Sequence, residues 1–254
     1  MSEGTRTPDR LDHNQELYQL SYAHRGSTNL PATRRRPSER ADRPPNTRRS
    51  ARHYLIALYE RDLPFTPELV EADRSALAAL WPPASIPVLV DDGVVIPESS
   101  TIVEHLDRHG DARPLIPIDQ DQALQARLWD RVADGYLTTP VQRIVGDALR
   151  PADAKDPHGV AQAHSIIELA YATLERQLDR PDRDAWLAGQ EFTLADCAAA
   201  PALHYANVLH PSHRDAHPAL AAYFDRVLAR SSVARVVDEA RPYRELFGST
   251  VRQR

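Results

Sequence analysis

The sequence predicts an α/β amino-terminal half followed by an all-α carboxyl-terminal half. Two observations lead to this fold class. Between residues 51 and 109, short β-branched runs alternate with stripes of helical spacing, whereas from about residue 119 onward every periodic segment is helical. The length of 254 residues suits either one large domain or two small ones, so the change of pattern favours two.

The first half is expected to alternate strands and helices. Residues 16–22 alternate apolar and polar side chains, as a half-buried strand does. Asp91-Asp92-Gly93 supplies a hairpin turn between two β-branched runs, and Gly110 follows the last apolar stripe. The predicted elements are a strand at 16–22, a helix at 51–62, a strand at 66–71, a helix at 73–81, strands at 88–90 and 94–96, and a helix at 98–110 that has Ser99 or Ser100 near its N-cap.

The second half is expected to contain only helices. Pro140 should kink or break the first of them, because proline removes a backbone donor inside a helix. The predicted helices cover 121–149, 158–178, 192–209, 219–230 and 232–246. The resulting organisation is a disordered tail at 1–15, an α/β domain at 16–110 with an Arg/Pro-rich, disordered insertion at about 25–48, a linker at 111–118, a helical domain at 119–247 and a tail at 248–254.

Composition excludes several classes of function. The net charge of −5 gives no general attraction to nucleic acid, although eight arginines lie between residues 34 and 52. No apolar run approaches the ~20 residues of a membrane span, and the first twenty residues lack a secretory signal. Cys197 is the single cysteine, so disulfides and cysteine-rich metal sites are excluded, and we expect a cytoplasmic protein without a membrane or nucleic-acid partner.

Ile86-Pro87 stands at the start of the predicted hairpin. Proline is tolerated at the first residue of a strand because its missing N–H lies outside the ladder. The functional interpretation is a cis peptide that turns the backbone N–H and C=O of Ile86 outward, where a peptide-like ligand pairs with them as an added strand.

Glu98-Ser99 follows the hairpin where a helix should begin. Acidic and hydroxyl residues in a first turn are often simple helix caps. The functional interpretation uses the same geometry: helix amides and a serine hydroxyl bind a ligand carboxylate, while the glutamate faces a ligand ammonium. A ligand with both groups on one carbon, an α-amino acid moiety, would be held at both ends.

Thr193 and Asp196 have the spacing of a capping box. Thr193 should cap the backbone N–H of Asp196, and Asp196 should accept from the Thr193 amide. We interpret this pair as structural, and Cys197, one residue later, as a buried small side chain rather than a nucleophile.

These motifs together resemble one family. IPVLVDDGVVIPESSTIVEHL, residues 86–106, is similar to the glutathione-site signature of the cytosolic glutathione transferases. WLAGQEFTLADCAAAPAL, residues 186–203, is similar to the capping segment of their helical domain, and the resemblance covers about residues 51–247. It implies a thioredoxin-like first domain, an all-helical second domain and a cytoplasmic homodimer.

The resemblance also implies an activity and a site. The activity is a detoxification reaction, in which the glutathione thiolate is conjugated to an electrophilic small molecule; glutathione is the co-substrate and no metal is needed. Ile86 would bind the cysteinyl part of glutathione through its backbone, beside a cis Pro87. Glu98 and Ser99 would hold the γ-glutamyl carboxylate and ammonium.

The family activates the thiol with a tyrosine, serine or cysteine at the end of the first strand or the start of the first helix. No cysteine lies between residues 22 and 50, which argues against a cysteine-type reductase. Ser27 is favoured because HRGST stands where the strand-end loop is expected. The alternatives are Thr28, Tyr22, Thr47 and Ser50.

The insertion leaves two alternatives open. Residues 25–48 are either a genuine loop over the glutathione site or a misread stretch of a GC-rich gene. If the thiol-activating residue has been lost, the chain is a non-catalytic glutathione-transferase-like binding or interaction module.

The histidines suggest no metal site. His204, Tyr205 and His210 lie on or just after one helix and are interpreted as surface and interface residues, because a metal site needs partners at helical spacing plus a carboxylate. The other histidines of the second half carry no motif. Tyr136 is a candidate for the electrophile pocket by analogy of fold alone.

Overall fold

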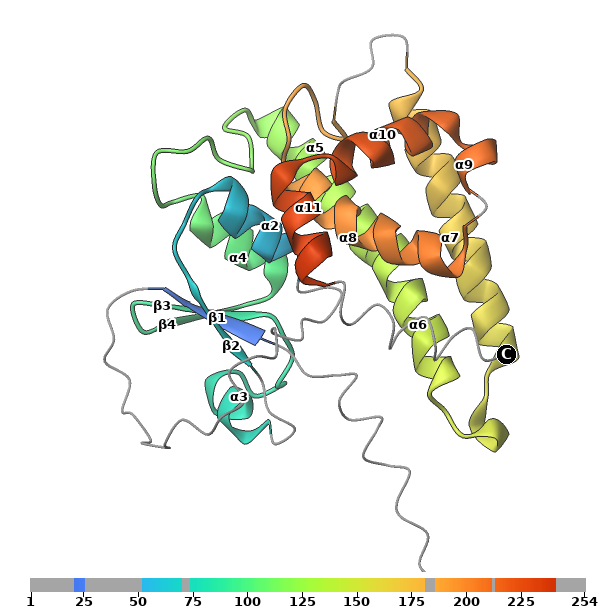
Figure 1. Cartoon of the computed structure of the whole chain (residues 1–254), viewed down its shortest axis with the longest axis horizontal. Coiled ribbons are helices and arrows are strands. Elements are labelled where there is room, and N and C mark those ends of the chain that lie inside the picture. Colours follow the sequence, from blue (N-terminus) through green and yellow to red (C-terminus); the bar gives the residue numbers. More distant parts are fainter. Residues whose placement is uncertain (1–20, 26–51, 70–73, 181–185, 212, 241–254) are drawn as a thin grey trace, which may run out of the picture.

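The computed structural model describes residues 21–25, 52–69, 74–180, 186–211 and 213–240 (Figure 1). In the first half the order of strands and helices is the one that the sequence predicts, and the α/β-plus-helical fold class is confirmed. The elements are β1 (Ser21–Arg25), α2 (Arg52–Glu60), β2 (Thr66–Leu69), α3 (Ser75–Leu80), β3 (Val88–Asp91), β4 (Val94–Pro97) and α4 (Ser99–Leu106). None of the helices in these ranges combines the length and apolarity needed to cross a bilayer.

The first strand ends later in the chain than predicted. The alternating pattern predicts a strand at 16–22, whereas β1 covers Ser21–Arg25. Arg25 therefore belongs to the sheet and not to the predicted insertion at about 25–48. Residues 16–20 and 26–51 lie outside the described residues.

The four strands form one mixed sheet in the order β2-β1-β3-β4. β1 is parallel to β3, with Ala23 beside Leu89 and Arg25 beside Asp91, and it is antiparallel to β2. A helix lies between β1 and β2 in the chain, a connection that normally joins parallel strands. Because β1 and β3 are parallel, the carboxyl end of β1 lies at the Asp91 end of β3.

Helices cover both faces of the sheet. All four residues of β3 are buried, as expected for a strand covered on both faces. Leu89 joins the large core shared with α2, α4 and the helical half, whereas Ile86 and Val88 pack with Leu77 of α3 in a smaller cluster. β3 is thus fixed between two apolar layers.

The second half consists of helices packed beside α2 and α4 (Figure 1). They are α5 (Gln120–Ala133), the π-helical turn η2 (Asp134–Thr138), α6 (Thr139–Ala148), the 3₁₀ turn η3 (Ala152–Ala154), α7 (Pro157–Leu178), α8 (Leu194–Leu209), α9 (His213–Ala216), α10 (Pro218–Leu228) and α11 (Ser231–Glu239). α8 is almost entirely buried and contacts both α5 and α2.

The irregularity in the first long helix differs from the prediction. The sequence places a kink at Pro140, but the departure from α-helical geometry is the π-helical turn at Asp134–Thr138. Pro140 occupies the first turn of α6, where its missing N–H costs little. Half of the Tyr136 side chain is exposed, and it projects from this π-helical turn.

Buried polar contacts fasten the end of α4 to α2. Arg61, one residue after α2, donates to the backbone carbonyls of Leu106, His109 and Ala112. Asp107 accepts from the amides of Leu115, at 2.9 Å, and Ile116. Hence the carboxyl ends of α2 and α4 meet, and the two packed helices run in the same direction.

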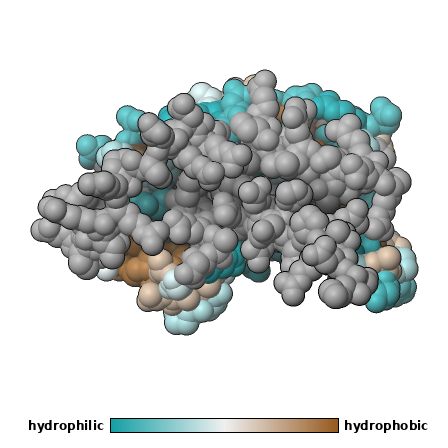
Figure 2. Space-filling view, turned by 60° about the horizontal axis from the view of Figure 1, so that its bottom comes forward, coloured by the Kyte–Doolittle hydropathy of each residue, from teal (hydrophilic) through white to brown (hydrophobic). Residues whose placement is uncertain are grey.

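The surface is mixed in polarity. On the face in Figure 2 the coloured residues are mostly hydrophilic, and one hydrophobic patch lies toward the lower left of the view. The exposed large apolar side chains of the described residues include Leu124 and Leu128 on α5.

Candidate functional site

The register of the β3–β4 hairpin brings the two sequence motifs to the same end of the hairpin, opposite its turn. Val88 is opposite Pro97, and directly opposed Cα atoms in antiparallel strands lie ~4.5–5.5 Å apart. Ile86-Pro87 immediately precedes Val88, and Glu98-Ser99 immediately follows Pro97. The Ile86–Pro87 peptide bond is cis.

Glu98 adopts an unusual backbone conformation. Its φ of 65° and ψ of 127° are in a region that residues other than glycine rarely occupy, at a cost of ~1–3 kcal/mol. Its carbonyl accepts from the Ile102 amide at 2.9 Å, so the residue is fixed at the N-cap of α4. The sequence predicts Ser99 or Ser100 near this cap, and Ser99 is the first helical residue, directly after it. The Glu98 side chain is exposed and makes no capping hydrogen bond.

The first turn of α4 is linked to the helical half by a contact that the sequence analysis missed. Ser100 Oγ donates to Asp130 Oδ2 of α5 at 2.8 Å. Asp130 is buried, and its Oδ1 has no hydrogen-bond partner among the described residues. A sequence signal existed, because Asp130 interrupts an apolar stripe beside Trp129.

Burial raises the pKa of the Asp130 carboxyl above its ordinary 3.8, and the hydrogen bond from Ser100 opposes this only partly. The folded chain therefore holds that proton more tightly than the unfolded chain. The contribution of Asp130 to stability is greatest below pH 3.8 and is lost as the pH rises through the pKa in the folded state.

The free energy of unfolding of Asp130→Asn, relative to that of wild type, should consequently be higher at pH 7 than at pH 4. Urea unfolding of both proteins at the two pH values measures this difference. Asp121→Asn, an exposed change at the start of α5, is the matched control. An Asp130→Asn effect that is independent of pH would contradict the assignment.

The candidate thiol-activating residues fall mostly outside the described part of the chain. Ser27, Thr28, Thr47 and Ser50 lie outside it, and for Tyr22 only the backbone on β1 is described. Because β1 is parallel to β3, its last residue, Arg25, lies beside Asp91, at the end of β3 away from Pro87. His24 and Arg25 are part of β1, and the remainder of HRGST lies outside the described residues.

The predicted capping pair makes more contacts than a capping box requires. Thr193 and Asp196 make both hydrogen bonds of the box at the start of α8. Asp196 also accepts from the Leu187 amide at 3.1 Å and from the Tyr223 hydroxyl at 2.7 Å. It thereby joins the segment before α8 to α10, and burial raises its pKa.

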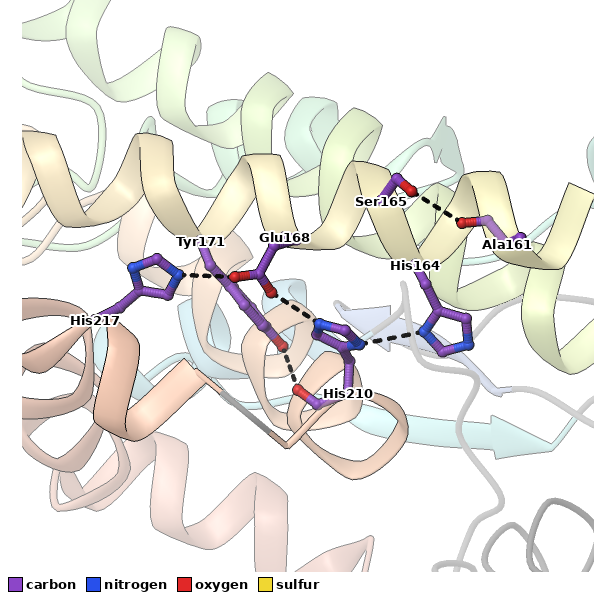
Figure 3. A network of polar contacts seen from close by, with 7 residues as sticks. All are labelled: Ala161, His164, Ser165, Glu168, Tyr171, His210 and His217. Carbon is purple, nitrogen blue, oxygen red and sulfur yellow. Dashed lines mark hydrogen bonds and ion pairs between the residues drawn. The ribbon is translucent and has the colours of Figure 1, made fainter.

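Two histidines that look scattered in the sequence, His210 and His217, contact Glu168, and a third, His164, contacts His210 (Figure 3). Glu168 Oε2 lies 2.8 Å from His210 Nε2, and Oε1 lies 3.2 Å from His217 Nε2. His210 Nδ1 lies 3.3 Å from His164 Nδ1, and the Tyr171 hydroxyl donates to the His210 carbonyl. The contact with His210 lowers the pKa of Glu168. The network joins the end of α8 and the start of α10 to α7, so its role is structural.

A small mixed sheet covered by helices, beside an all-helical half, defines a thioredoxin-like protein with a helical second domain. Residues 49–114 match the family described as "Glutathione S-transferase, N-terminal domain", and residues 157–226 match "Glutathione S-transferase, C-terminal domain". The chain belongs to the glutathione S-transferase family.

Individual relatives agree with this assignment. The chain is 26% identical to the glutathione S-transferase-like protein LUC7 of Fusarium sp. over 174 residues, which are 66% of this chain and 77% of that protein. It is similar to a glutathione S-transferase from Methylobacterium radiotolerans, solved in complex with glutathione sulfonate: 33% identity, TM-score 0.65, 75% of this chain and 90% of that chain covered. A family member from Pseudomonas fluorescens, solved with bound glutathione, is 27% identical with a TM-score of 0.64, over 74% of this chain and 94% of that chain.

Proposed function

We propose that this protein is a cytoplasmic glutathione transferase that adds the glutathione thiolate to an electrophilic small molecule. The register that joins Ile86-Pro87 to Glu98-Ser99 is the observation that carries the proposal. The Ile86 backbone pairs with the cysteinyl part of glutathione. The first-turn amides of α4 and the Ser99 hydroxyl bind the γ-glutamyl carboxylate, and Glu98 faces its ammonium.

The Glu98 backbone supports this assignment. Strained residues are kept where the surrounding structure or a ligand requires their orientation, and they cluster at binding sites. A φ of 65° at an exposed glutamate has no evident packing reason. It is explained if the residue presents its carboxylate to a ligand at the tip of α4.

The reaction requires a thiolate. A free thiol of pKa ~8.5 is only about 3% ionised at pH 7, and lowering that pKa by ~2 units corresponds to about 2.7 kcal/mol. A hydroxyl donor beside a helix amino terminus can supply stabilisation of this size. The protein therefore needs one hydroxyl donor close to Pro87, where the glutathione thiol would lie.

Chain direction favours Ser50 among the candidates for this role. α2 and α4 run the same way, so the start of α2 lies on the side of Ser99. Ser50 is two residues before α2 and Thr47 is five residues before it. Tyr22 precedes Ala23, which lies beside Leu89 of β3. Ser27 and Thr28 instead follow the opposite end of β1.

The test measures glutathione affinity together with turnover of a generic aryl halide. Ser50→Ala should lower turnover at least about tenfold with unchanged glutathione affinity, and should shift the pH profile of turnover upward, because the bound thiol would regain its ordinary pKa. Ser27→Ala should leave both quantities unchanged. Turnover lost in Ser27→Ala but kept in Ser50→Ala would reverse the assignment. Glutathione binding by wild type without turnover would identify a non-catalytic binding module.

We also propose a homodimer that uses the exposed face of α5. Leu124 and Leu128 are one turn apart, and 63% and 46% of their surfaces are exposed. Exposed leucines at this spacing form an apolar stripe that a second copy could cover. The Leu124→Asp/Leu128→Asp double variant should convert a dimer to a monomer in light scattering. The control is Leu169→Asp, an equally exposed leucine on α7. A double variant that remains dimeric would place the interface elsewhere.

A further inference from the structure

A second cluster of polar side chains lies at the other end of α4. Asp91 is the last residue of β3, His105 lies in the last turn of α4, and His109 follows four residues later. One ligand-type atom from each lies within 4.8 Å of the other two. Asp91 Oδ2 is 2.7 Å from His105 Nε2 and 3.5 Å from His109 Nε2, and the two nitrogens are 3.2 Å apart.

We propose that Asp91, His105 and His109 form a binding site for a divalent transition metal of the zinc type. Ligand atoms bound at ~2.0–2.1 Å around a tetrahedral zinc lie ~3.3–3.5 Å from one another. The observed separations are close to this range, and the largest adjustment is an opening of about 0.6 Å between Asp91 and His105. The three atoms therefore fit a single ion with small side-chain movements.

The ligand set selects the class of metal. Two imidazole nitrogens and one carboxylate suit zinc, cobalt, nickel or copper, whereas magnesium and calcium prefer oxygen ligands. The side chains of His105 and His109 are 18% and 33% exposed, so solvent can complete the coordination shell. By contrast, His210 uses one nitrogen toward Glu168 and the other toward His164, so the atoms in Figure 3 form a chain and do not face one point.

The location suggests a structural role. Asp91 is opposite Val94 in the hairpin, at the end away from Val88 and Pro97. His105 is six residues along α4 from Ser99, about 9 Å at 1.5 Å per residue. A metal here would fasten β3 to the end of α4 without contacting the proposed glutathione site, and this inference does not depend on the proposed function.

The experiment titrates the full-length protein, stripped of metal with a chelator, with Zn²⁺ and with Co²⁺ in the absence of glutathione. We expect one saturable equivalent, a rise in melting temperature with Zn²⁺, and the visible absorption of low-coordinate Co²⁺. His105→Gln and His109→Gln should each weaken Zn²⁺ binding at least about tenfold and remove the rise in melting temperature. His158→Gln, an exposed change on α7, is the control and should retain both.

Two results would overturn the proposal. One is the absence of saturable binding to the folded wild-type protein. The other is unchanged Zn²⁺ affinity in both His105→Gln and His109→Gln. Binding that is lost only when His164 is replaced is one form of this second result. Because His109 is partly exposed, its variant should fold, and circular dichroism before titration verifies this.

Discussion

Glu98→Ala is expected to weaken glutathione binding at least about tenfold, equivalent to about 1.4 kcal/mol. The variant removes the carboxylate that we propose to face the ligand ammonium, while the backbone at the start of α4 is unchanged. Ser99→Ala should cost a similar amount, because it removes the hydroxyl that we propose as a donor to the ligand carboxylate. The double variant should lose about a hundredfold if the two contacts are independent. Isothermal titration calorimetry measures all three.

Glu104→Ala is the matched control for this series. It removes the same charge from the same helix, but Glu104 is exposed and its carboxylate pairs with Arg127 of α5. Its affinity for glutathione should equal that of wild type. Unchanged affinity in Glu98→Ala or in Ser99→Ala would count directly against the assignment of that residue to the site.

Asp196→Ala is expected to lower the free energy of unfolding by about 3 kcal/mol or more. A capping box alone is worth about 1 kcal/mol, which is the loss expected for Thr193→Ala. The larger effect at Asp196 arises because the amides of Leu187 and Thr193 and the Tyr223 hydroxyl would each lose a buried acceptor. Urea unfolding of the two variants measures the difference.

Two controls accompany this prediction. Asp225→Ala removes an aspartate whose ion pair with Arg214 is exposed, and it should cost less than about 1 kcal/mol. Glutathione affinity of folded Asp196→Ala should be close to that of wild type. A loss of affinity at an unchanged melting temperature would show that Asp196 acts on the ligand and is not structural.

The local features of the site were predictable from the sequence because local interactions encode them. Asp-Asp-Gly between two β-branched runs specifies a hairpin, and a hairpin brings the residues before its first strand next to those after its second. The positions of Ile86, Pro87, Glu98 and Ser99 relative to one another follow from this. The Thr193–Asp196 box is equally local, since three residues of spacing suffice to place both hydrogen bonds.

Contacts between distant segments were not predictable in the same way. The sequence predicts no metal site, although His105 and His109 have helical spacing. Asp91, which lies 2.7 Å from His105 Nε2 and 3.5 Å from His109 Nε2, is on a strand that only the packing of α4 brings close. Further contacts between distant segments are the hydrogen bond from Ser100 to Asp130 and the contact of Glu168 with His210.

The sequence by itself determined the order of the strands and helices, the hairpin with its two flanking motifs, and the family, because hydrophobic periodicity and turn chemistry act over a few residues. The tertiary structure decided the direction of β1 relative to β3. It also decided which buried polar groups meet across α4, α5, α7 and α10. These outcomes depend on how whole elements pack, and the free energy of packing is shared among residues far apart in the chain.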